Sequence, residues 1–374
     1  MNVVFAAGGT GGHLYPALAV AGALQKSAAE AGLPMHISFL GNAGRLEATL
    51  VPQAGYRLFF IAGRPLQRRL SLQTLLTIVS NAYGVLLALA VLRRTRPDLI
   101  IATGGYVCFP VVVAAALLRA MRMSCARVAL LEINAYPGLT NRLLAPLVHE
   151  VWGAFASAAA FFGAKYHRTG IPVRSELTSR SRSQAVFFFG LDSTKQTILV
   201  IGGSQGARSI NQAVIALLTR RQLPETWQIL LISGERDYKW VQARAHDMLE
   251  SNVMKVVPYA DDMAGAYAAS DLVISRAGAS TLGELAFTGK PSILVPYPFA
   301  AENHQTANAR VFAQAGAAYI LEDGALRGDA LWPLLCECMQ PAKLRAMSVQ
   351  ARSLTAGDAI RQIMLRIRAL AKHG

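Results

Sequence analysis

Short apolar runs alternate with longer helical patterns along the chain. In the first half, the runs predict strands at Val3–Ala7, Met35–Leu40, Leu99–Ala102 and Arg127–Leu131. Repeated alternation of strand and helix is typical of parallel sheets whose two faces are covered by helices. The hydrophobic pattern therefore predicts the α/β class.

The same pattern restarts at Thr197, where TILVIGGSQGARSINQAVIALL reads as strand, glycine turn and helix. Further strands are predicted at Gln228–Ile232, Lys255–Val257, Leu272–Ser275 and Ser292–Pro296. We expect two Rossmann-like domains over residues 1–168 and 169–345, because Gly170 and Pro172 interrupt regular structure near that boundary. Residues 346–374 are expected to form a helical tail that could pack back on the first domain. The stretch from Ser181 to Ser193 gives no prediction.

Composition and charge narrow the class of protein. The 374 residues are 53% hydrophobic and 16% charged, which is ample for two cores, and the formal net charge is +15. Such a charge suits nucleic acid, an anionic membrane or a phosphorylated substrate. The cysteines, at positions 108, 125, 336 and 338, have no metal-finger spacing, and the start has no basic leader. Free thiols in the cytoplasm are therefore expected.

One glycine loop follows the first strand of each half. These loops are Gly8–Gly12 in the first half and Gly202–Gly206 in the second. Glycines at a strand-to-helix turn let a phosphate approach the backbone, at the sheet edge where open α/β folds bind ligands. Neither loop has the dinucleotide spacing or the lysine of a P-loop, and FLGNAGR lacks the acidic residue that would hold an NAD ribose. A tight turn without a ligand is the alternative interpretation.

A nucleotide-sugar fits the stretch that begins at Asp271 better than either cofactor does. The turn Ala277–Ser280 exposes amides at a helix start, which suits a diphosphate. One turn later, Glu284 has a carboxylate able to accept hydrogen bonds from ribose hydroxyls, although it is also an ordinary carboxylate for the start of a helix. Asn303, His304 and Gln305 then offer groups that can contact sugar hydroxyls.

These motifs resemble one known family. GGTGGHLYPALAVA, GGSQGARSIN and SRAGASTLGELAFTGKPSILVPYP…ENHQTANA, with weaker support from GGYVCFP and GLTNR, are similar to the MurG family of glycosyltransferases. The resemblance implies a GT-B fold, with two Rossmann-like domains whose parallel sheets face a central cleft. It also implies transfer of N-acetylglucosamine from UDP-N-acetylglucosamine to undecaprenyl-diphospho-muramyl-pentapeptide (lipid I), at the cytoplasmic face of the cell membrane.

The resemblance also implies roles for individual residues. Those at the donor sugar and diphosphate are Thr10, Gly11, Gly12 and Asn134, while Arg174 and Ser204 contact the nucleotide or diphosphate and the backbone of Ala260 contacts uracil. The diphosphate and ribose are held by Ala279, Ser280, Thr281, Leu282, Gly283 and Glu284, and the sugar hydroxyls by Gln305. Departures from the family pattern at Leu131, Ile133 and Ile171 affect the expected acceptor contacts.

His13 matches the family's candidate general base. The family inverts the anomeric carbon, so the C4 hydroxyl of the acceptor loses a proton as it attacks, and neutral histidine suits that step. The positive end of the helix dipole at His13 disfavours the imidazolium form. A histidine that only caps the turn or contacts phosphate is the alternative. No DxD motif is present, because Asp261 and Asp262 are adjacent, so we expect no metal cofactor.

A long apolar stretch between arginines raises the question of membrane contact. Helical spacing relates Leu72, Leu75, Leu76, Val79, Tyr83, Leu86, Leu87 and Ala90, with Arg64, Arg68 and Arg69 before them and Arg93, Arg94 and Arg96 after. Polar residues such as Thr77 and Asn81 interrupt the stretch, which argues against a spanning helix. The alternatives are a helix packed in the core and an apolar face on an anionic membrane. No RNA-binding motif is found, so no nucleic-acid partner is expected.

Three other functions are weighed against this one. The first is a transferase of the same fold that uses another lipid acceptor, such as diacylglycerol. Such a protein would differ from the proposed one only in the first domain, which selects the acceptor. A non-catalytic nucleotide-sugar binding protein would lack the His13 loop, which is present. An NAD-dependent oxidoreductase is disfavoured by the glycine spacing.

Overall fold

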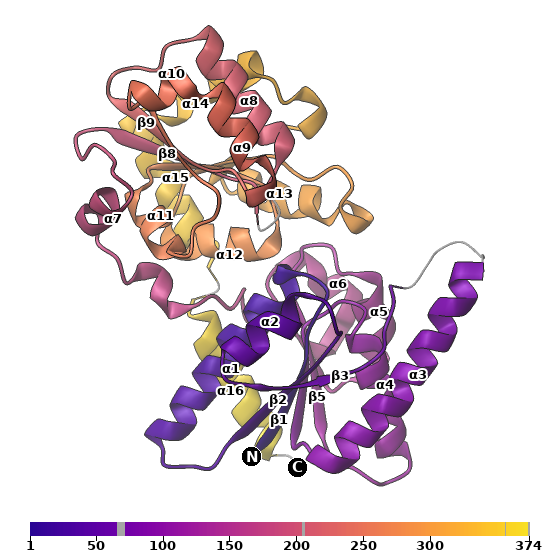
Figure 1. Cartoon of the computed structure of the whole chain (residues 1–374). Coiled ribbons are helices and arrows are strands. Elements are labelled where there is room, and N and C mark those ends of the chain that lie inside the picture. Colours follow the sequence, from indigo (N-terminus) through magenta and orange to yellow (C-terminus); the bar gives the residue numbers. More distant parts are fainter. Residues whose placement is uncertain (66–71, 204–205, 356, 373–374) are drawn as a thin grey trace. The chain divides into compact units, whose positions relative to one another are not determined.

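The chain folds into two compact α/β units (Figure 1). The structure is a computed structural model that describes residues 1–65, 72–203, 206–355 and 357–372. Unit 1 comprises Met1–Pro172 and Ala356–Gly374, and unit 2 comprises Val173–Thr355. Unit 1 is therefore built from two separate parts of the chain.

Unit 1 contains a parallel sheet of seven strands in the order β3-β2-β1-β4-β5-β6-β7. The strands are β1 (Asn2–Ala6), β2 (His36–Gly41), β3 (Arg57–Phe60), β4 (Leu99–Ala102), β5 (Arg127–Glu132), β6 (Glu150–Gly153) and β7 (Tyr166–Arg168). The four strands predicted in this half are confirmed as β1, β2, β4 and β5. The direction of the crossovers reverses between β1 and β4, so their carboxyl ends form the switch point of the sheet, where folds of this class bind ligands.

The helices of unit 1 cover this sheet. They are α1 (Gly11–Glu30), α2 (Leu46–Gln53), α3 (Leu72–Thr95), α4 (Cys108–Ala120), α5 (Leu139–Leu144), α6 (Ala159–Phe162) and α16 (Ala359–Lys372), with 3-10 turns η1 (Ala145–Leu147), η2 (Ala156–Ala158) and η3 (Gly163–Lys165). Strand residues such as Val4 and Ile100 pack against α4 residues such as Val111, and all three are fully buried. Continuous burial of this kind is expected of strands covered on both faces.

Unit 2 repeats the arrangement with six parallel strands in the order β10-β9-β8-β11-β12-β13. The strands are β8 (Gln196–Ile201), β9 (Trp227–Ile232), β10 (Met254–Val257), β11 (Leu272–Ser275), β12 (Ser292–Leu294) and β13 (Ala318–Ile320). The helices are α7 (Arg182–Phe188), α8 (Arg208–Arg220), α9 (Glu235–Arg244), α10 (His246–Glu250), α11 (Met263–Ala269), α12 (Ala279–Thr288), α13 (His304–Gln314), α14 (Gly328–Cys338) and α15 (Pro341–Ser353), with 3-10 turns η4 (Ser175–Thr178), η5 (Ala301–Asn303) and η6 (Asp323–Ala325). The switch point lies between β8 and β11.

The unpatterned stretch after Ser181 contains helix α7. Ser181 and Gln184 form a reciprocal capping box, in which each side chain accepts a hydrogen bond from the other's backbone amide. Ala185 and Val186 are buried, whereas Phe187 and Phe188 are exposed. The helix therefore depends on its cap and a small buried face, which is why hydrophobic periodicity does not reveal it.

The tail of the chain divides between the units. Helix α15 packs against α12 of unit 2, and α16 packs against α1 of unit 1. Arg366 of α16 forms an ion pair with Glu150 of β6, with Arg366 Nε donating to Glu150 Oε2 at 3.0 Å. The buried Trp152 indole donates to the same oxygen at 2.7 Å. Packing of part of the tail on unit 1 thus rests on a buried carboxylate as well as on apolar contact.

The first half of helix α3 buries small and polar residues and exposes large apolar ones, whereas its second half buries apolar residues such as Ala88 and Leu92. Thr77 and Asn81 are buried, and the Asn81 amide bonds both the backbone amide and the carbonyl of Arg64. A Cβ on Gly84 would collide with the Ala62 carbonyl oxygen, so this side of the helix packs closely on the unit. The large exposed residues are Leu75, Leu76, Ile78, Val79, Tyr83 and Leu86. The alternative that the predicted apolar face packs in the core is therefore wrong for these residues; Arg68 and Arg69 lie outside the described residues.

Candidate active site

His13 stands at the switch point of unit 1. It is the third residue of α1, and its ring lies against the loop that follows β4. His13 Nδ1 lies 2.8 Å from the carbonyl oxygen of Thr103. A Cβ on Gly104 would come within 2.8 Å of the imidazole, and Gly104 has a φ of +97°, so only glycine permits this close approach. The loop after β4 is therefore shaped around the histidine.

The contact with Thr103 determines which imidazole nitrogen can act as a base. A carbonyl oxygen can only accept a hydrogen bond, so His13 Nδ1 must carry the proton. In the neutral ring the lone pair then lies on Nε2. This orientation by a fixed acceptor is the arrangement that general-base histidines use.

The first glycine loop is held from within by Glu47, a buried residue of α2 that the sequence reasoning missed. Its carboxylate accepts hydrogen bonds from the backbone amide of Gly9, at 3.2 and 3.3 Å, and from that of Asn42 at 3.0 Å. Gly9 also has a φ of +91° and contacts the ring of Tyr106. Glu47 therefore fixes the path of the glycine loop and takes up the Gly9 amide.

Thr10 is the N-cap residue of α1, and its side chain makes no capping hydrogen bond. Thr10 is exposed, and Gly11 and Gly12 are half-buried. The start of α1 therefore presents backbone amides and the positive end of the helix dipole beside His13. The arrangement suits an anionic or strongly polar ligand group.

Glu132 organises the loop that carries Asn134. Its carboxylate accepts from the Asn134 backbone amide at 2.9 Å, from the Asn134 side chain at 3.1 Å and from the Gly138 amide at 3.1 Å. It also accepts from the Asn141 side chain at 2.9 Å, and Asn141 lies beside Gly104 and therefore beside His13. Burial raises the pKa of Glu132, against the lowering effect of these hydrogen bonds. Leu131 and Ile133, which depart from the family pattern, are buried.

In unit 2, the start of α12 carries the predicted diphosphate and ribose residues. Gly278 is the N-cap of α12, and Ala279, Ser280 and Thr281 form its first turn, where the positive end of the helix dipole lies. Leu282 and Gly283 are buried and fix the helix on the sheet. The geometry is that of a helix N-terminus able to receive an anion.

Glu284 is partly buried and has a partner that sequence reasoning missed. The hydroxyl of Tyr267, a fully buried residue of α11, donates to Glu284 Oε2 at 2.8 Å. Burial raises the pKa of Glu284, and the Tyr267 hydrogen bond and the nearby charge of Arg174 partly oppose that rise. The alternative of a solvated helix-start carboxylate does not match this environment. Arg174 itself lines a cavity of about 230 Å³ together with Asp262.

The remaining predicted residues of unit 2 differ in how far the structure describes their contacts. Gln305 begins α13, and its Oε1 accepts from the Tyr297 amide at 2.9 Å. Ala260 is buried in the loop before α11. Ser204 lies outside the described residues. Of the predicted sugar-binding side chains at the start of α13, Gln305 thus already uses its carbonyl oxygen to hold the loop before the helix.

Arg276 is a further missed residue at the carboxyl edge of the unit 2 sheet. It donates to Asp323 Oδ1 at 2.6 Å, to the Ser209 hydroxyl at 2.9 Å and to two backbone carbonyls. Asp323 in turn accepts from Ser209 at 2.7 Å. The network connects the start of α8 to the loop after β11, so its charge is committed to structure. Within the described residues, no group of three His, Cys, Asp or Glu side chains is placed to hold a metal ion.

Comparisons with known proteins cover nearly the whole chain. Residues 3–152 match the family model of the Glycosyltransferase family 28 N-terminal domain, and residues 197–363 match that of the Glycosyltransferase family 28 C-terminal domain. A UDP-N-acetylglucosamine–N-acetylmuramyl-(pentapeptide) pyrophosphoryl-undecaprenol N-acetylglucosamine transferase from Moorella thermoacetica is 41% identical over 98% of this chain and 99% of its own. The transferase of the same name from Desulfitobacterium hafniense strain Y51 is 39% identical over 97% and 98%.

A solved structure agrees with these relatives. The crystal structure of Acinetobacter baumannii MurG superposes with a TM-score of 0.76 at 28% identity and covers 98% of this chain and 99% of its own. The two parallel sheets with their covering helices are those of the GT-B fold, so the predicted fold class is confirmed.

Proposed function

The chain belongs to glycosyltransferase family 28, and from that membership we propose the reaction it catalyses and the residues that perform it. It is a glycosyltransferase that moves N-acetylglucosamine from UDP-N-acetylglucosamine to undecaprenyl-diphospho-muramyl-pentapeptide in peptidoglycan synthesis. The observation that carries this reaction is identity of about 40% over nearly the full length of transferases of that name. The predicted family resemblance is confirmed.

The donor is held by unit 2 in this proposal. The amides at the start of α12 bind the diphosphate, and Glu284 accepts hydrogen bonds from the ribose. Tyr267 supports this role because it holds Glu284 Oε2 and orients the carboxylate. The side-chain amide of Gln305 and the loop carrying Asn134 contact the sugar, Ser204 the diphosphate, and the backbone of Ala260 contacts uracil.

His13 is the general base in this proposal. Its Nδ1 proton is directed at the Thr103 carbonyl, so Nε2 takes the proton of the acceptor C4 hydroxyl. As the hydroxyl oxygen forms the new bond to the anomeric carbon, the bond to UDP breaks and its electron pair leaves with the diphosphate. Thr10, Gly11 and Gly12 supply backbone donors next to this reaction.

The departing diphosphate is stabilised by the α12 N-terminus and Arg174, without a protein-bound metal. We therefore expect transfer to proceed at an undiminished rate in EDTA, measured as labelled N-acetylglucosamine incorporated into lipid. Loss of activity in EDTA that Mg²⁺ or Mn²⁺ restores would overturn this part of the proposal.

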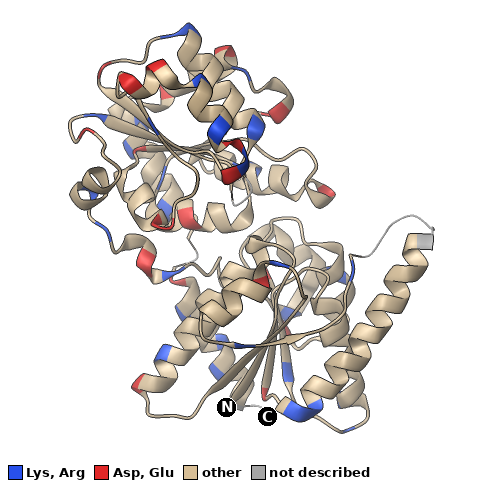
Figure 2. Cartoon of the chain, viewed as in Figure 1, with Lys and Arg blue, Asp and Glu red and all other residues tan. Residues whose placement is uncertain are grey.

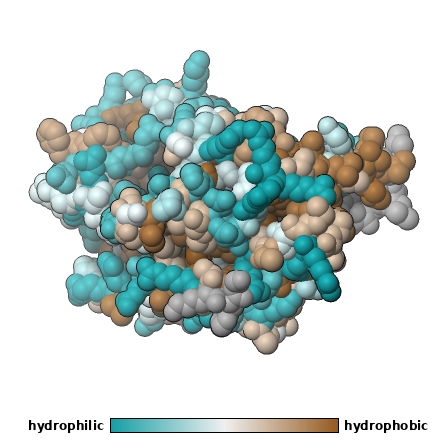
Figure 3. Space-filling view, turned by 90° about the horizontal axis from the view of Figure 1, so that it is seen from below, coloured by the Kyte–Doolittle hydropathy of each residue, from teal (hydrophilic) through white to brown (hydrophobic). Residues whose placement is uncertain are grey.

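Helix α3 places the enzyme at an anionic membrane surface in this proposal. It is long and apolar enough to span a membrane by length and composition, with a mean hydropathy of 2.1. However, its polar residues pack on the unit while six large apolar residues are exposed. Figure 2 shows α3 without charge along most of its length, and Figure 3 shows apolar atoms gathered at the edge of the molecule that α3 forms. An exposed apolar face with arginines near its ends supports an interfacial position on the cytoplasmic side.

One assay tests the acceptor directly. Purified enzyme is given labelled UDP-N-acetylglucosamine with lipid I or with diacylglycerol, each in the same detergent. We expect label to move to lipid I alone. Transfer to diacylglycerol in place of lipid I would show another lipid glycosyltransferase of the same fold, and donor binding without transfer to either would show a binding protein.

A further inference from the structure

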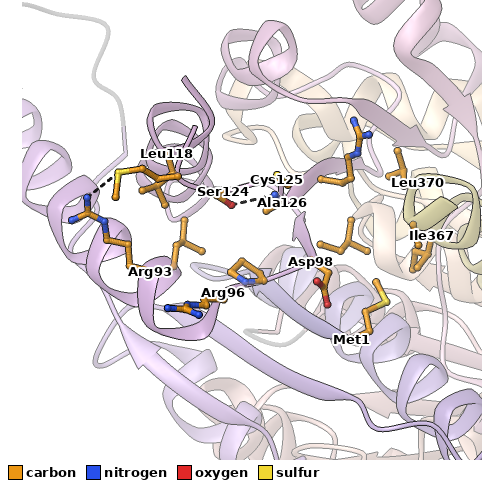
Figure 4. Close-up of a pocket in the computed structure, with 16 residues that line it drawn as sticks. Met1, Arg93, Arg96, Asp98, Leu118, Ser124, Cys125, Ala126, Ile367 and Leu370 are labelled. Atoms are coloured by element: carbon orange, nitrogen blue, oxygen red, sulfur yellow. Dashed lines mark hydrogen bonds between the residues drawn. The ribbon is translucent and has the colours of Figure 1, made fainter. Parts of the chain in front are cut away.

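Unit 1 has a cavity of about 810 Å³ at the amino ends of its strands, the edge opposite to His13 (Figure 4). Its lining includes Asp98 and Leu99 at the start of β4 and Arg127 at the start of β5. The lengths of β1 and β4 separate it from the loops of the proposed active site. Its size is within the range of about 300–1,000 Å³ that is usual for small-molecule sites.

The walls of this cavity are apolar and come from three helices. Leu92 of α3 and Leu118 of α4 lie on one side, and Ile367 and Leu370 of α16 lie on the other. Figure 4 shows Leu118 facing the two α16 residues across the space, with the segment from Ser124 to Ala126 between them. The described part of the lining contains no aromatic residue on which a nucleobase could stack.

Positive charge surrounds the cavity. Among the residues that the structure describes, Arg93, Arg96 and Arg127 line it, together with one carboxylate, that of Asp98. The Asp98 carboxylate already accepts a hydrogen bond from the Asn2 amide at 2.7 Å. Arg93 donates to the sulfur of Met123 at 3.2 Å, a neutral and weak acceptor that leaves the arginine's charge uncompensated by that contact. An anion at the rim would gain from this excess of positive charge.

We propose that this cavity binds a phosphate-bearing lipid, with the phosphate at the arginine rim and a single acyl chain against Leu92, Leu118 and the α16 residues. An apolar interior beside a cationic rim matches an amphiphile with an anionic head. The site is separate from the donor and acceptor sites of the proposed transferase reaction. Binding there would join α3 and α4 to α16, the helix that returns to unit 1 from the far end of the chain.

Cys125 provides a direct readout of this site. Its thiol is exposed and lines the cavity, whereas Cys108 and Cys338 are buried and the half-buried Cys336 lies in unit 2. We measure the rate at which a thiol reagent labels Cys125, located by peptide mapping, as lysophosphatidylglycerol is added below its micelle concentration. Saturable slowing at Cys125, with the Cys336 rate unchanged, is expected.

Two matched probes separate the head from the chain. Monoacylglycerol, which has the same chain and no phosphate, should protect Cys125 about tenfold more weakly. Glycerol phosphate, which has the head without the chain, should not protect it. Protection by glycerol phosphate alone would reveal a simple phosphate site, and equal protection by lysophosphatidylglycerol and monoacylglycerol would reveal an apolar pocket that does not recognise phosphate; either result overturns the proposal.

Charge-reversal variants test the arginines with a matched control. Arg93→Glu with Arg96→Glu should weaken lysophosphatidylglycerol protection about tenfold. Arg94→Glu with Arg122→Glu makes the same change in net charge at exposed positions that do not line the cavity, and should have little effect. Each pair contains one residue at positive φ, Arg96 or Arg122, so backbone effects are matched as well. Equal weakening in both pairs, or absence of protection in the parent protein, would refute the proposal.

Discussion

His13 shows how one residue can be specified by partners far away in sequence. The ring is aligned by Thr103 and accommodated by Gly104, about ninety residues further along. Any residue at position 103 would have a backbone carbonyl. The orientation of the His13 ring therefore depends on the shape of the loop after β4 and not on the side chain of Thr103. A Gly104→Ala change would therefore displace the base, because the added Cβ would collide with the His13 ring.

Replacement of the base should lower turnover and spare donor binding. We expect His13→Ala to reduce kcat by about 10²-fold or more, the usual size of a general-base effect, with little change in KM for UDP-N-acetylglucosamine. Steady-state transfer to lipid I gives both constants, and His36→Ala, at an exposed position of the same unit, is the control. Turnover close to that of the parent enzyme would show that His13 only supports the loop.

Tyr267→Phe should weaken binding of the donor and shift the pH dependence of donor binding. The missing hydroxyl removes one hydrogen bond to Glu284, so we expect KM for the donor to rise about fivefold at unchanged kcat. A ribose hydroxyl binds the ionised carboxylate, so donor affinity falls as pH drops through the Glu284 pKa, which burial raises above its ordinary value of 4.5. Because Tyr267 opposes that rise, its loss should move this acid limb to higher pH.

The measurement is UDP binding by calorimetry as a function of pH. Tyr259→Phe, at an exposed residue of the same unit, should leave the profile in place. A Tyr267→Phe variant with lower affinity but the same acid limb would show that the tyrosine acts only through packing.

Local motifs revealed some site residues and could not reveal others. His13 and Glu284 lie in contiguous glycine-rich or small-residue stretches whose chemistry is readable from the neighbours. Glu47 and Tyr267 act on groups 38 and 17 residues away, and nothing in their own surroundings indicates a partner. Their roles follow from the packing of α2 and α11, which only the fold supplies.

At the scale of elements, the first half of α3 is amphipathic with the usual sense reversed, while its second half buries apolar residues such as Leu92. Close packing through Gly84 and a hydrogen-bonded Asn81 attaches the helix to its unit, so large apolar side chains are not needed there. The periodicity was sufficient to predict a helix with two different sides. Which side faces the protein depended on the hydrogen bonds to the backbone of Arg64, which the pattern does not encode.

Removal of the exposed apolar side chains should reduce membrane binding. Val79→Gln with Leu86→Gln is expected to lower the affinity for anionic vesicles by about 10- to 100-fold, because each residue contributes on the order of 1 kcal/mol of burial. Vesicle flotation measures this. Leu33→Gln with Val349→Gln makes the same substitutions at exposed positions outside α3 and should not change binding. Equal loss in both variants would argue against α3 as the contact.

The strands that sequence reasoning missed are short and of mixed polarity. Strand β7 reads Tyr-His-Arg, and β3 has only a short apolar run, Leu-Phe-Phe, after Arg57. Strands β3 and β7 are the two edge strands of the sheet, so each has a neighbouring strand on one side only. Central strands such as β1, after Asn2, and β4 are apolar because both of their faces are covered, and these were predicted within one residue of their bounds.

At the scale of the whole molecule, unit 1 depends on a helix from beyond unit 2. The Glu150 carboxylate is buried, which raises its pKa, but the hydrogen bonds from Arg366 and Trp152 outweigh burial and leave the pKa below its ordinary value. A carboxyl group whose pKa is lower in the folded protein than in the unfolded chain stabilises the fold at pH values above its ordinary pKa. That stability is lost as pH falls through the lowered pKa.

Arg366→Met should therefore destabilise the protein at neutral pH. We expect a loss of about 1–3 kcal/mol, moderated because the arginine is partly exposed, and a correspondingly lower Tm by calorimetry. The difference from the parent should shrink as pH falls through the lowered Glu150 pKa, because Glu150 then becomes protonated in both proteins. Arg368→Met, at an exposed position on the same helix, is the control, and an equal change in Tm there would assign the effect to net charge.

The discontinuity of unit 1 also sets an order for its synthesis on the ribosome. Unit 2 is one continuous stretch, Val173–Thr355, and all its strands have been translated before α16 exists. Unit 1 begins first, yet Glu150 and the face of α1 that receives α16 have no native partner from that helix until residue 366 and its neighbours emerge. The nascent chain thus carries an incomplete first unit through the whole translation of the second, and a chaperone that covers this face would act in that interval.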